Sequence, residues 1–310
     1  MKKPVLKISF SDFWPGFNKH NNFFTQLLSE EYILQVVEHS PDILVYSSFG
    51  TEFLDYRCIR FFYTGEQITP NFKLCDYALS FQRAHQRNFR LPLYLMYGYY
   101  ELTNVKPHFS DFLQEKRKFC NFVYSNRHCK KRNNFFHKLS KYKVVDSGGK
   151  LWNNIGRPVD DKCKFLQNYK FSIAFENECY PGYTTEKIVE PMTANSLPIY
   201  WGNPFIDKEF NSRSFLNYFD FQNENELIEK IIFLDQNDSA YEKYYTEPYL
   251  SQNKIPDSLA KKNILLFFKN SLSTGPIIKK PEGILKSINR MEHGFNNKLM
   301  RARSRIRGIV

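Results

Sequence analysis

Side chains with complementary chemistry are concentrated between Glu176 and Lys187. The apolar run Phe171–Phe175 precedes them and predicts a buried strand, and α/β folds display polar side chains where such strands end. Thr184 or Thr185 can then cap a helix that carries Lys187 in its first turn. Exposed N–H groups and the positive end of the helix dipole favour an anion at such a start, and Lys187 adds a full charge. The segment therefore predicts a binding site for a phosphate or another anion.

The same junction offers groups that could recognise an organic ligand. Tyr183 can stack on a base or a sugar or donate its hydroxyl, and Asn177 stands directly after the strand. The alternative is that Glu186 only complements the helix dipole and that Lys187 is an exposed surface residue. A strand, a loop and a helix cap follow one another here, and Asn177 and Tyr183 lie in the same loop. This order favours a binding site over a purely structural role.

The elements that must position these groups follow an α/β pattern. Short β-rich runs alternate with helical ones, which is typical of parallel sheets. We expect two facing Rossmann-like domains, residues 1–115 and 116–275, followed by a basic helical tail, residues 276–310. Sites in open α/β sheets lie beyond the carboxyl ends of strands, so two such sheets would place one ligand on each side of an inter-domain cleft. The expected strands are Val5–Phe10, Ile33–Val37, Ile43–Ser47, Ile59–Tyr63, Tyr77–Phe81, Leu91–Met96, Phe119–Ser125, Lys143–Asp146, Phe171–Phe175 and Leu197–Trp201. The expected helices are Asn22–Tyr32, His108–Lys118, Asn133–Tyr142, Lys162–Tyr169, Thr185–Asn195 and Asn225–Asp235.

The composition predicts a large folded core. Hydrophobic residues make up 42% and aromatic residues 17% of the 310 residues, which excludes a chain that is disordered throughout. No apolar run approaches the roughly 18 residues that span a bilayer, and the N-terminus has too little apolar length for a signal peptide. None of the six cysteines forms a CxxC pair, so free thiols are expected. These features predict a cytoplasmic protein.

Three motifs in the second half resemble the signature of the α-1,3-fucosyltransferase family. They are Phe175-Glu176-Asn177, Tyr183-Thr184-Thr185-Glu186-Lys187 and Pro198-Ile199-Tyr200-Trp201-Gly202, in that order and at the family's spacing. The resemblance extends over about residues 5 to 270, and the tail lies outside it. Further similar segments are Ile8–Trp14, Pro41–Leu44, Ser48–Gly50, Phe62–Glu66, Cys75–Ala78, and Ser125-Asn126 leading to Arg132-Asn133.

This resemblance implies two Rossmann-like domains of the GT-B type that transfer L-fucose from GDP-β-L-fucose with inversion. It implies that Arg132 and Lys187 hold the diphosphate of the donor, and that Asn177, Tyr183 and Glu186 lie around the nucleotide and the fucose. A guanidinium can bind two phosphate oxygens at once, whereas an ammonium is a point charge. For Arg132, which follows two lysines, the alternative is a solvated basic face.

The resemblance also implies that Glu66 is the general base. Glu66 follows the expected strand Ile59–Tyr63 and a flexible Gly65, so it can reach into a cleft and take the proton of an acceptor hydroxyl. Glu186 could stabilise the oxocarbenium-like sugar as the bond to GDP breaks. A turn carboxylate at the end of a strand is the alternative for Glu66. No DxD-type motif stands out, so we expect a reaction that needs neither a metal ion nor a cofactor.

The acceptor implied by the family is a GlcNAc or N-acetyllactosamine-type glycan joined through an α-1,3 linkage, in protein or lipopolysaccharide glycan synthesis. The chain is shorter than bacterial members of the family between about Tyr97 and Lys118, a part that helps to shape the acceptor side. Asp12 and Trp14 could line that side, with packing as the alternative for the aromatic ring.

Two other functions compete with this interpretation. Another GT-B transferase that uses a nucleotide sugar, such as a GDP-mannose-dependent enzyme, would share the architecture. A nucleic-acid-binding protein is compatible with the net charge of +12, but no recognition motif accompanies the charge, so no nucleic-acid partner is expected.

Much of the positive charge lies in the tail. Residues 276–310 contain nine Lys and Arg against two Glu, so +7 of the net charge falls there. Apolar side chains recur in it at helical spacing, which describes a basic amphipathic helix able to lie on an anionic membrane surface. The alternatives are packing against the catalytic domains or a second subunit, and a tail that only aids solubility. A membrane-bound tail would place the protein peripherally on the cytoplasmic membrane face. The apolar positions are Ile284, Ile288, Met291, Phe295 and Leu299.

Overall fold

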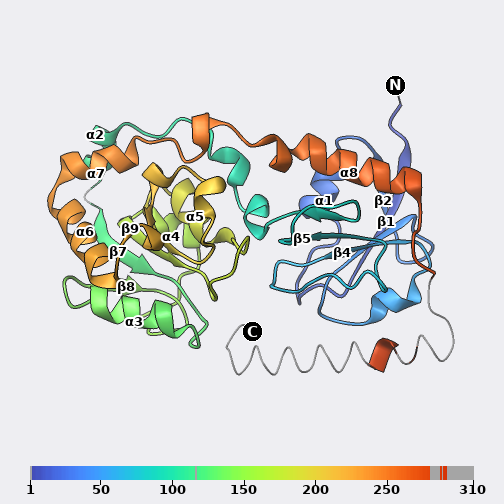
Figure 1. Ribbon diagram of the computed structural model, residues 1–310, viewed down its shortest axis with the longest axis horizontal. Helices are drawn as coiled ribbons and strands as arrows, with labels where there is room; N and C mark the ends of the chain where they lie inside the picture. Colours follow the sequence, from blue (N-terminus) through green and yellow to red (C-terminus); the bar gives the residue numbers. More distant parts are fainter. Residues whose placement is uncertain (1, 116, 280–286, 288, 292–310) are drawn as a thin grey trace. The chain divides into compact units, whose positions relative to one another are not determined.

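The computed structural model describes residues 2–115, 117–279, 287 and 289–291, and these form two compact units (Figure 1). The first unit contains the described residues up to Pro92 and those from Pro256 onward, and the second contains Leu93–Ile255. The chain therefore passes through the second unit once and returns to the first. The boundaries expected from the sequence differ from these, since residues 93–115 belong to the second unit and residues 256–275 to the first.

A parallel sheet of 6 strands forms the centre of the first unit, in the order β2-β1-β3-β4-β5-β6. β1 pairs with β2 on one side and with β3 on the other, so the strand order reverses between β1 and β3. Ligands of open α/β sheets bind at such a point, beyond the carboxyl ends of the strands. The strands are β1 (Val5–Ser11), β2 (Ile33–Val36), β3 (Ile43–Tyr46), β4 (Ile59–Tyr63), β5 (Tyr77–Ser80) and β6 (Asn88–Arg90).

Helix α8 (Lys261–Thr274) packs on this sheet beside α1 (Phe23–Leu28), although the two helices are far apart in the sequence (Figure 1). The ring of Phe268 is buried and lies 4.7 Å from that of Phe61 on β4 and 6.4 Å from that of Phe24 on α1, measured between centroids. These ring contacts make α8 part of the core of the first unit. Buried aromatic rings of this kind contribute much of the stability of a protein core.

The buried carboxylate of Asp76 holds the segment that follows α8. One oxygen accepts the N–H groups of Ile277 (2.8 Å) and Ile278 (2.9 Å), and the other accepts the N–H of Arg60 on β4 (2.8 Å). Asp76, in the segment Cys75–Ala78 that resembles the family, therefore has a structural role. Its carboxylate fixes the start of the basic tail to β4.

The second unit is built on a parallel sheet of 5 strands, in the order β11-β10-β9-β7-β8. β7 pairs with β8 on one side and with β9 on the other, so the strand order reverses between β7 and β9. The strands are β7 (Lys118–Phe122), β8 (Val145–Ser147), β9 (Tyr169–Phe175), β10 (Leu197–Trp201) and β11 (Leu216–Asn217). The helices are α2 (Phe109–Gln114), α3 (Lys130–Leu139), α4 (Lys162–Leu166), α5 (Glu186–Thr193), α6 (Glu224–Gln236) and α7 (Asp238–Tyr245).

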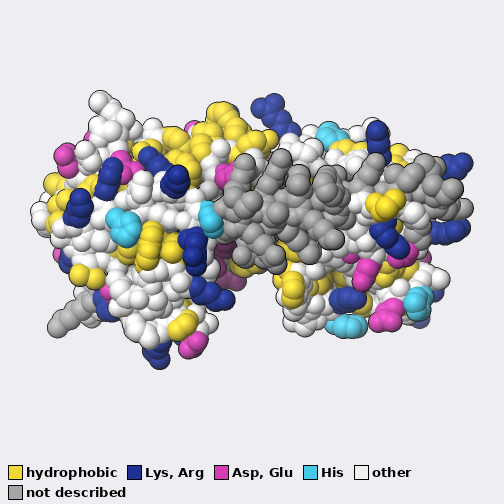
Figure 2. Space-filling view, turned by 90° about the horizontal axis from the view of Figure 1, so that it is seen from below, with side chains coloured by type: hydrophobic (Ala, Val, Ile, Leu, Met, Phe, Trp, Pro, Cys, Tyr) yellow, Lys and Arg dark blue, Asp and Glu magenta, His cyan; other side chains and the backbone are white. Residues whose placement is uncertain are grey.

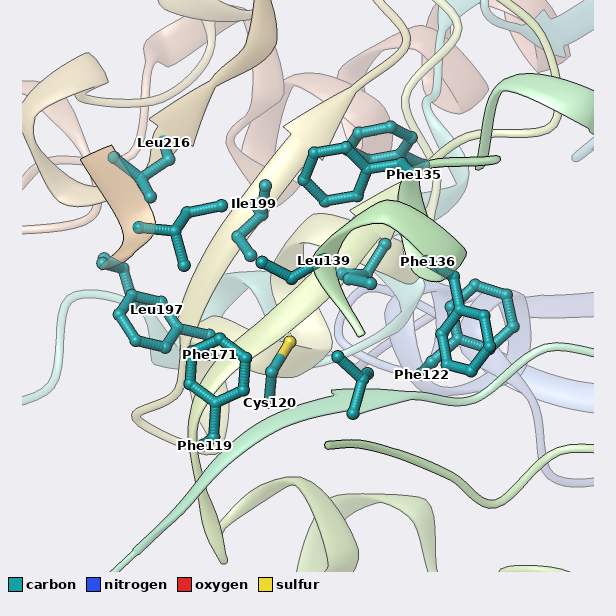
Figure 3. Packing of buried hydrophobic residues seen from close by; sticks show 14 of the residues in the cluster. Phe119, Cys120, Phe122, Phe135, Phe136, Leu139, Phe171, Leu197, Ile199 and Leu216 are labelled. Carbon is teal, nitrogen blue, oxygen red and sulfur yellow. The ribbon is translucent and has the colours of Figure 1, made fainter. Parts of the chain in front are cut away.

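The two faces of this sheet are covered by different helices. Figure 3 shows aromatic and aliphatic side chains from β7, β9, β10 and α3 in one closely packed cluster, which also includes residues of α6 and α7. Phe171, Ile173 and Phe175 contribute to this cluster, whereas α4 and α5 also contact β9 but contribute no residue to it. Alternation along a strand explains the division, because successive side chains point to opposite faces.

The predicted α/β architecture with two Rossmann-like sheets is confirmed, but several local predictions are wrong. Lys118 and Tyr169, expected at the ends of helices, are the first residues of β7 and β9. β6 ends at Arg90, and the expected strand at Leu91–Met96 is instead a short 3-10 helix, Leu93–Met96, that follows Pro92 at the start of the second unit. Helix α3 begins at Lys130, before the expected start at Asn133. No helix among the described residues is long and apolar enough to cross a bilayer. Most of the predicted amphipathic tail lies outside the described residues.

Candidate active site

The predicted strand-to-helix junction forms as expected and lies at the point where the second sheet reverses its strand order. β9 ends at Phe175, and Glu176 and Asn177 follow it directly. α5 begins at Glu186 with Thr185 as its N-cap residue. The polar groups between β9 and α5 therefore stand beyond the carboxyl ends of β7 and β9, where this class of sheet binds ligands.

Lys187 is held at the junction by two carboxylates and a hydroxyl. Its Nζ donates to Thr185 Oγ1 (2.9 Å) and lies 3.2 Å from Glu186 Oε1 and 3.3 Å from Glu176 Oε2. The side chain of Lys187 is only 12% exposed, which excludes the alternative of a freely solvated surface lysine. The junction is thus a compact charge cluster with one cation between two anions.

The electrostatics of the cluster favour the charged forms of Lys187 and Glu186. Burial lowers the pKa of Lys187, but Glu186 and Glu176 outweigh burial, and the pKa lies well above its usual range. Burial raises the pKa of Glu186, but Lys187 and Lys162 outweigh it and leave the pKa of this carboxyl below its usual value. For Glu176 burial dominates and raises the pKa, although Lys187 and the hydrogen bonds from Thr185 oppose it.

Arg132 lies on α3 and is completely buried. Its guanidinium donates to Asn177 Oδ1 (2.9 Å) and to the carbonyl oxygens of Asn126 (2.9 Å) and Phe175 (3.3 Å), and it stacks 3.9 Å from the centre of the Tyr124 ring. Its Nε is buried and makes no hydrogen bond among the described residues. The alternative of a solvated basic face is therefore wrong for Arg132. Its guanidinium orients Asn177 at the end of β9, and its contact with a diphosphate remains a prediction.

Tyr183 is 4% exposed, so most of its ring is covered by protein. Its N–H donates to the carbonyl oxygen of Tyr180 (3.1 Å), and its phenol is near enough to raise the pKa of Lys187. Because little of the residue is open, Tyr183 offers no free ring face for stacking. The sequence could not show this, since burial of one ring depends on the whole loop.

Two residues after β10 hold the loop between β9 and α5, and the sequence analysis assigned neither of them a role in the site. Asn203 is buried; its Oδ1 accepts the N–H of Gly182 (2.9 Å) and its Nδ2 donates to Thr184 Oγ1 (3.1 Å). Gly202 lies against Glu176, so that a Cβ at this position would be 2.7 Å from Cβ of Glu176. The signal for Gly202 was present, because it ends the Pro198–Gly202 motif, and Asn203 follows that motif directly.

Glu66 belongs to the first unit and follows β4 after two residues. Thr64 Oγ1 accepts the N–H of Glu66 (3.0 Å) and donates to its carbonyl oxygen (3.2 Å), which fixes the backbone of the turn. The side chain is partly exposed. The proposed base Glu66 thus belongs to the first unit. All the residues expected to bind the donor belong to the second unit: Arg132, Asn177, Tyr183, Glu186 and Lys187.

A hollow of about 500 Å³ opens where the first sheet reverses its strand order, between the ends of β1 and β3. Trp14, which is 38% exposed, and Phe49 are among the aromatic side chains that line it. Asp12 also lines it, but its carboxylate accepts the N–H groups of Glu52 (3.0 Å) and Phe53 (2.8 Å) and so begins a short 3-10 helix. Trp14 is therefore the group of this pair that is open to a ligand.

No group of three or more His, Cys, Asp or Glu side chains that could hold a metal ion occurs among the described residues. All six cysteines are free thiols.

Two family models match the chain. The model of the alpha-(1,3)-fucosyltransferase FucT N-terminal domain matches residues 8–97, and the model of the C-terminal part of glycosyltransferase family 10 (fucosyltransferase) matches residues 113–258. The chain therefore belongs to the family 10 fucosyltransferases and is a glycosyltransferase, as the signature motifs predict.

Individual relatives agree with this assignment. The alpha-(1,3)-fucosyltransferase FucT of Helicobacter pylori is 31% identical over 88% of this chain and 67% of its own length, so the chain spans about two thirds of that relative. A putative fucosyltransferase of Acanthamoeba polyphaga mimivirus is 37% identical over 49% of this chain and 28% of its own length. The crystal structure of an alpha1,3-fucosyltransferase with GDP-fucose matches with a TM-score of 0.76 at 30% identity, over 91% of this chain and 94% of that chain.

The buried setting of Arg132 predicts a stability effect that the exposed Lys130 on the same helix should not share. Arg132→Ala removes three hydrogen bonds and a stacked ring contact, so we expect the free energy of unfolding to fall by about 3 kcal/mol. Lys130→Ala should change it by less than about 0.5 kcal/mol. Calorimetric unfolding of both variants checks this, and equal stability of the two would contradict the structural role of Arg132.

Proposed function

We propose that the protein transfers L-fucose from GDP-β-L-fucose to a hydroxyl of a GlcNAc or N-acetyllactosamine-type glycan, forming an α-1,3 linkage with inversion. The observation that carries this proposal is the charge cluster around Lys187 at the start of α5, in a family 10 chain. The similarity to an alpha1,3-fucosyltransferase crystallised with GDP-fucose supports the choice of donor. A helix start with an adjacent ammonium is suited to a diphosphate.

The second unit binds the donor in this proposal. Lys187 and Arg132 offset the negative charge that grows on GDP as the glycosidic bond breaks, and preorganised charge of this kind provides much of the rate enhancement of many enzymes. Glu186 keeps a lowered pKa, so it is a carboxylate at neutral pH and stabilises the positive charge that develops on the sugar. Asn177 and Tyr183 contact the nucleotide and the fucose with their amide and hydroxyl.

The first unit supplies the base and binds the acceptor. Glu66 removes the proton of the acceptor hydroxyl as that oxygen attacks the anomeric carbon, and a single displacement inverts the configuration. The hollow beside Trp14 suits a pyranose, because an aromatic ring offers an apolar face and the hollow also contains the polar Thr51 and Lys19. The two protein cations supply the charge compensation that other enzymes obtain from a metal ion, so the proposed reaction needs none.

The proposal extends to the basic tail and to the place where the enzyme works. The excess of Lys and Arg in residues 276–310 binds the anionic face of a cytoplasmic membrane, where a lipid-linked acceptor would be available. The anchor of Ile277 and Ile278 on Asp76 ties the start of this tail to the first unit. On the face in Figure 2, Lys and Arg of the second unit are interspersed with hydrophobic and acidic side chains, an arrangement unlike the continuous basic stripe of a nucleic-acid-binding protein.

Loss of the Lys187 ammonium tests the donor site. Lys187→Ala removes the ammonium that lies between Glu176 and Glu186, so we expect the dissociation constant of GDP to rise about tenfold or more, the effect of losing a hydrogen bond to a charged group. Lys164→Ala, whose side chain is 83% exposed on α4, is the matched control and should bind GDP as the unmodified protein does. Isothermal titration calorimetry measures both, and unchanged GDP affinity in Lys187→Ala would refute the donor site.

Glu66→Gln tests the base and the reaction together. The amide cannot accept a proton, so we expect the rate of transfer to fall by about 100-fold or more, while GDP affinity stays unchanged. The assay combines GDP-fucose with a panel of GlcNAc and N-acetyllactosamine glycans, with linkage analysis of the product and with EDTA in a parallel reaction. Transfer from GDP-mannose instead of GDP-fucose, or a rate that EDTA abolishes, would contradict the corresponding part of the proposal.

Charge removal in the 310-residue chain tests the tail. Replacing Arg301, Arg303, Arg305 and Arg307 by Gln removes four of its positive charges, each worth about 1 kcal/mol of attraction near an anionic surface. We expect the unmodified protein to sediment with phosphatidylglycerol vesicles but not with phosphatidylcholine vesicles, and the variant to sediment with neither. Equal sedimentation of both proteins with the anionic vesicles would show that the tail does not carry the binding.

A further inference from the structure

Glu176 is a fully buried carboxylate that the proposed reaction does not use. Both of its oxygens have partners on the first turn of α5 or next to it. Oε1 accepts the N–H of Thr185 (2.7 Å), Oε2 accepts the hydroxyl of Thr185 (2.7 Å), and Oε2 also lies 3.3 Å from the Nζ of Lys187. A buried charge destabilises a protein unless it is paired and hydrogen-bonded. These contacts therefore offset the free-energy cost of burying the Glu176 carboxylate.

Thr185 connects this carboxylate to Lys187 instead of capping its own helix. A threonine at an N-cap commonly accepts an N–H of the first turn through its hydroxyl oxygen. Thr185 makes no such cap bond to α5, although its φ of −114° and ψ of −171° are extended as in a cap. Its Oγ1 donates to Glu176 and accepts from the Nζ of Lys187 (2.9 Å). The side chain of the N-cap residue therefore binds Glu176 and the Lys187 ammonium instead of an N–H group of α5.

The space that Glu176 occupies depends on the absence of a side chain at Gly202. A Cβ on Gly202 would be 2.7 Å from Cβ of Glu176 and 2.9 Å from the hydroxyl of Tyr200, closer than such atoms approach in proteins. The N–H of Glu176 donates to the carbonyl oxygen of Trp201 (2.7 Å), which ties its backbone to the end of β10 as well. Glu176 is therefore fixed by the sheet, and Thr185 and Lys187 are fixed by Glu176.

From these contacts we infer that Glu176 is a positioning residue for the donor, which acts through Thr185 to hold the Lys187 ammonium and the start of α5 where the diphosphate binds. The inference rests on the proposed function, because it assigns the diphosphate to Lys187. A lysine side chain has four rotatable carbon–carbon bonds, and fixing it in advance reduces the entropy that ligand binding must overcome. The raised pKa of Lys187, caused in part by Glu176, agrees with this role because it keeps the ammonium charged.

The test uses Glu176→Gln, which keeps the shape but removes the charge, and Thr185→Val, which keeps the shape but removes the hydroxyl. We expect each to raise the dissociation constant of GDP about tenfold and to leave that of guanosine, which lacks phosphate, within about twofold. The KM for GDP-fucose should rise more than kcat falls. Thr185→Ser keeps both hydrogen bonds and should match the unmodified protein, which makes it the control.

A double-variant cycle shows whether the effect passes through Lys187. Glu176→Gln combined with Lys187→Ala should bind GDP within about twofold of Lys187→Ala alone, because the positioned group is already absent. Additive losses, or equal losses for GDP and guanosine, would assign Glu176 a structural role only and overturn the inference. If Glu176→Gln does not fold, the same comparison is made with Thr185→Val alone and combined with Lys187→Ala, and the same two outcomes support or overturn the inference. Normal GDP affinity in Lys187→Ala would instead overturn the proposed donor site, so the two failures are distinguishable.

Discussion

The burial of one carboxylate constrains most of the candidate site. Glu176 has no contact with water, so its charge must be compensated inside the protein. Thr185 and Lys187 provide that compensation through two hydrogen bonds and an ion pair. The same contacts fix the first turn of α5 against the end of β9. A stability requirement, the pairing of a buried charge, therefore also determines where the Lys187 ammonium stands.

The loop between β9 and α5 gains its shape from β10, the neighbouring strand. Asn203 binds Gly182 and Thr184 of the loop, and Gly202 leaves room for Glu176. Buried hydrogen bonds at several points make a loop more rigid, and a site with several polar groups requires such support. The signature motifs that follow β9 and the end of β10 with Asn203 thus belong to a single hydrogen-bonded structure.

The topology of each sheet explains where the hollow of the first unit and the charge cluster of the second lie. In each unit the strand order reverses beside the first strand of the sheet, at β1 and β3 in one and at β7 and β9 in the other. The helices and loops that follow these strands leave in opposite directions and open a space between them. In the first unit this space is the aromatic hollow beside Trp14, and in the second it holds the charge cluster of Lys187. One unit thus offers apolar faces and the other offers charge.

Part of the fold and of the candidate site could be predicted from the sequence, because that part depends on residues close to one another in the chain. The strand that ends at Phe175, the helix that begins near Lys187 and the alternation of strands and helices are encoded in residues close to one another, and so is the family signature. The buried position of Arg132 inside α3, the coverage of Tyr183 and the return of α8 to the first unit were not predicted, since each depends on side chains distant in the sequence. The sequence by itself determined the types of the charged groups and their order. Only the tertiary structure decided which of them are paired, because the pairing follows from burial, and burial is a property of the packed chain.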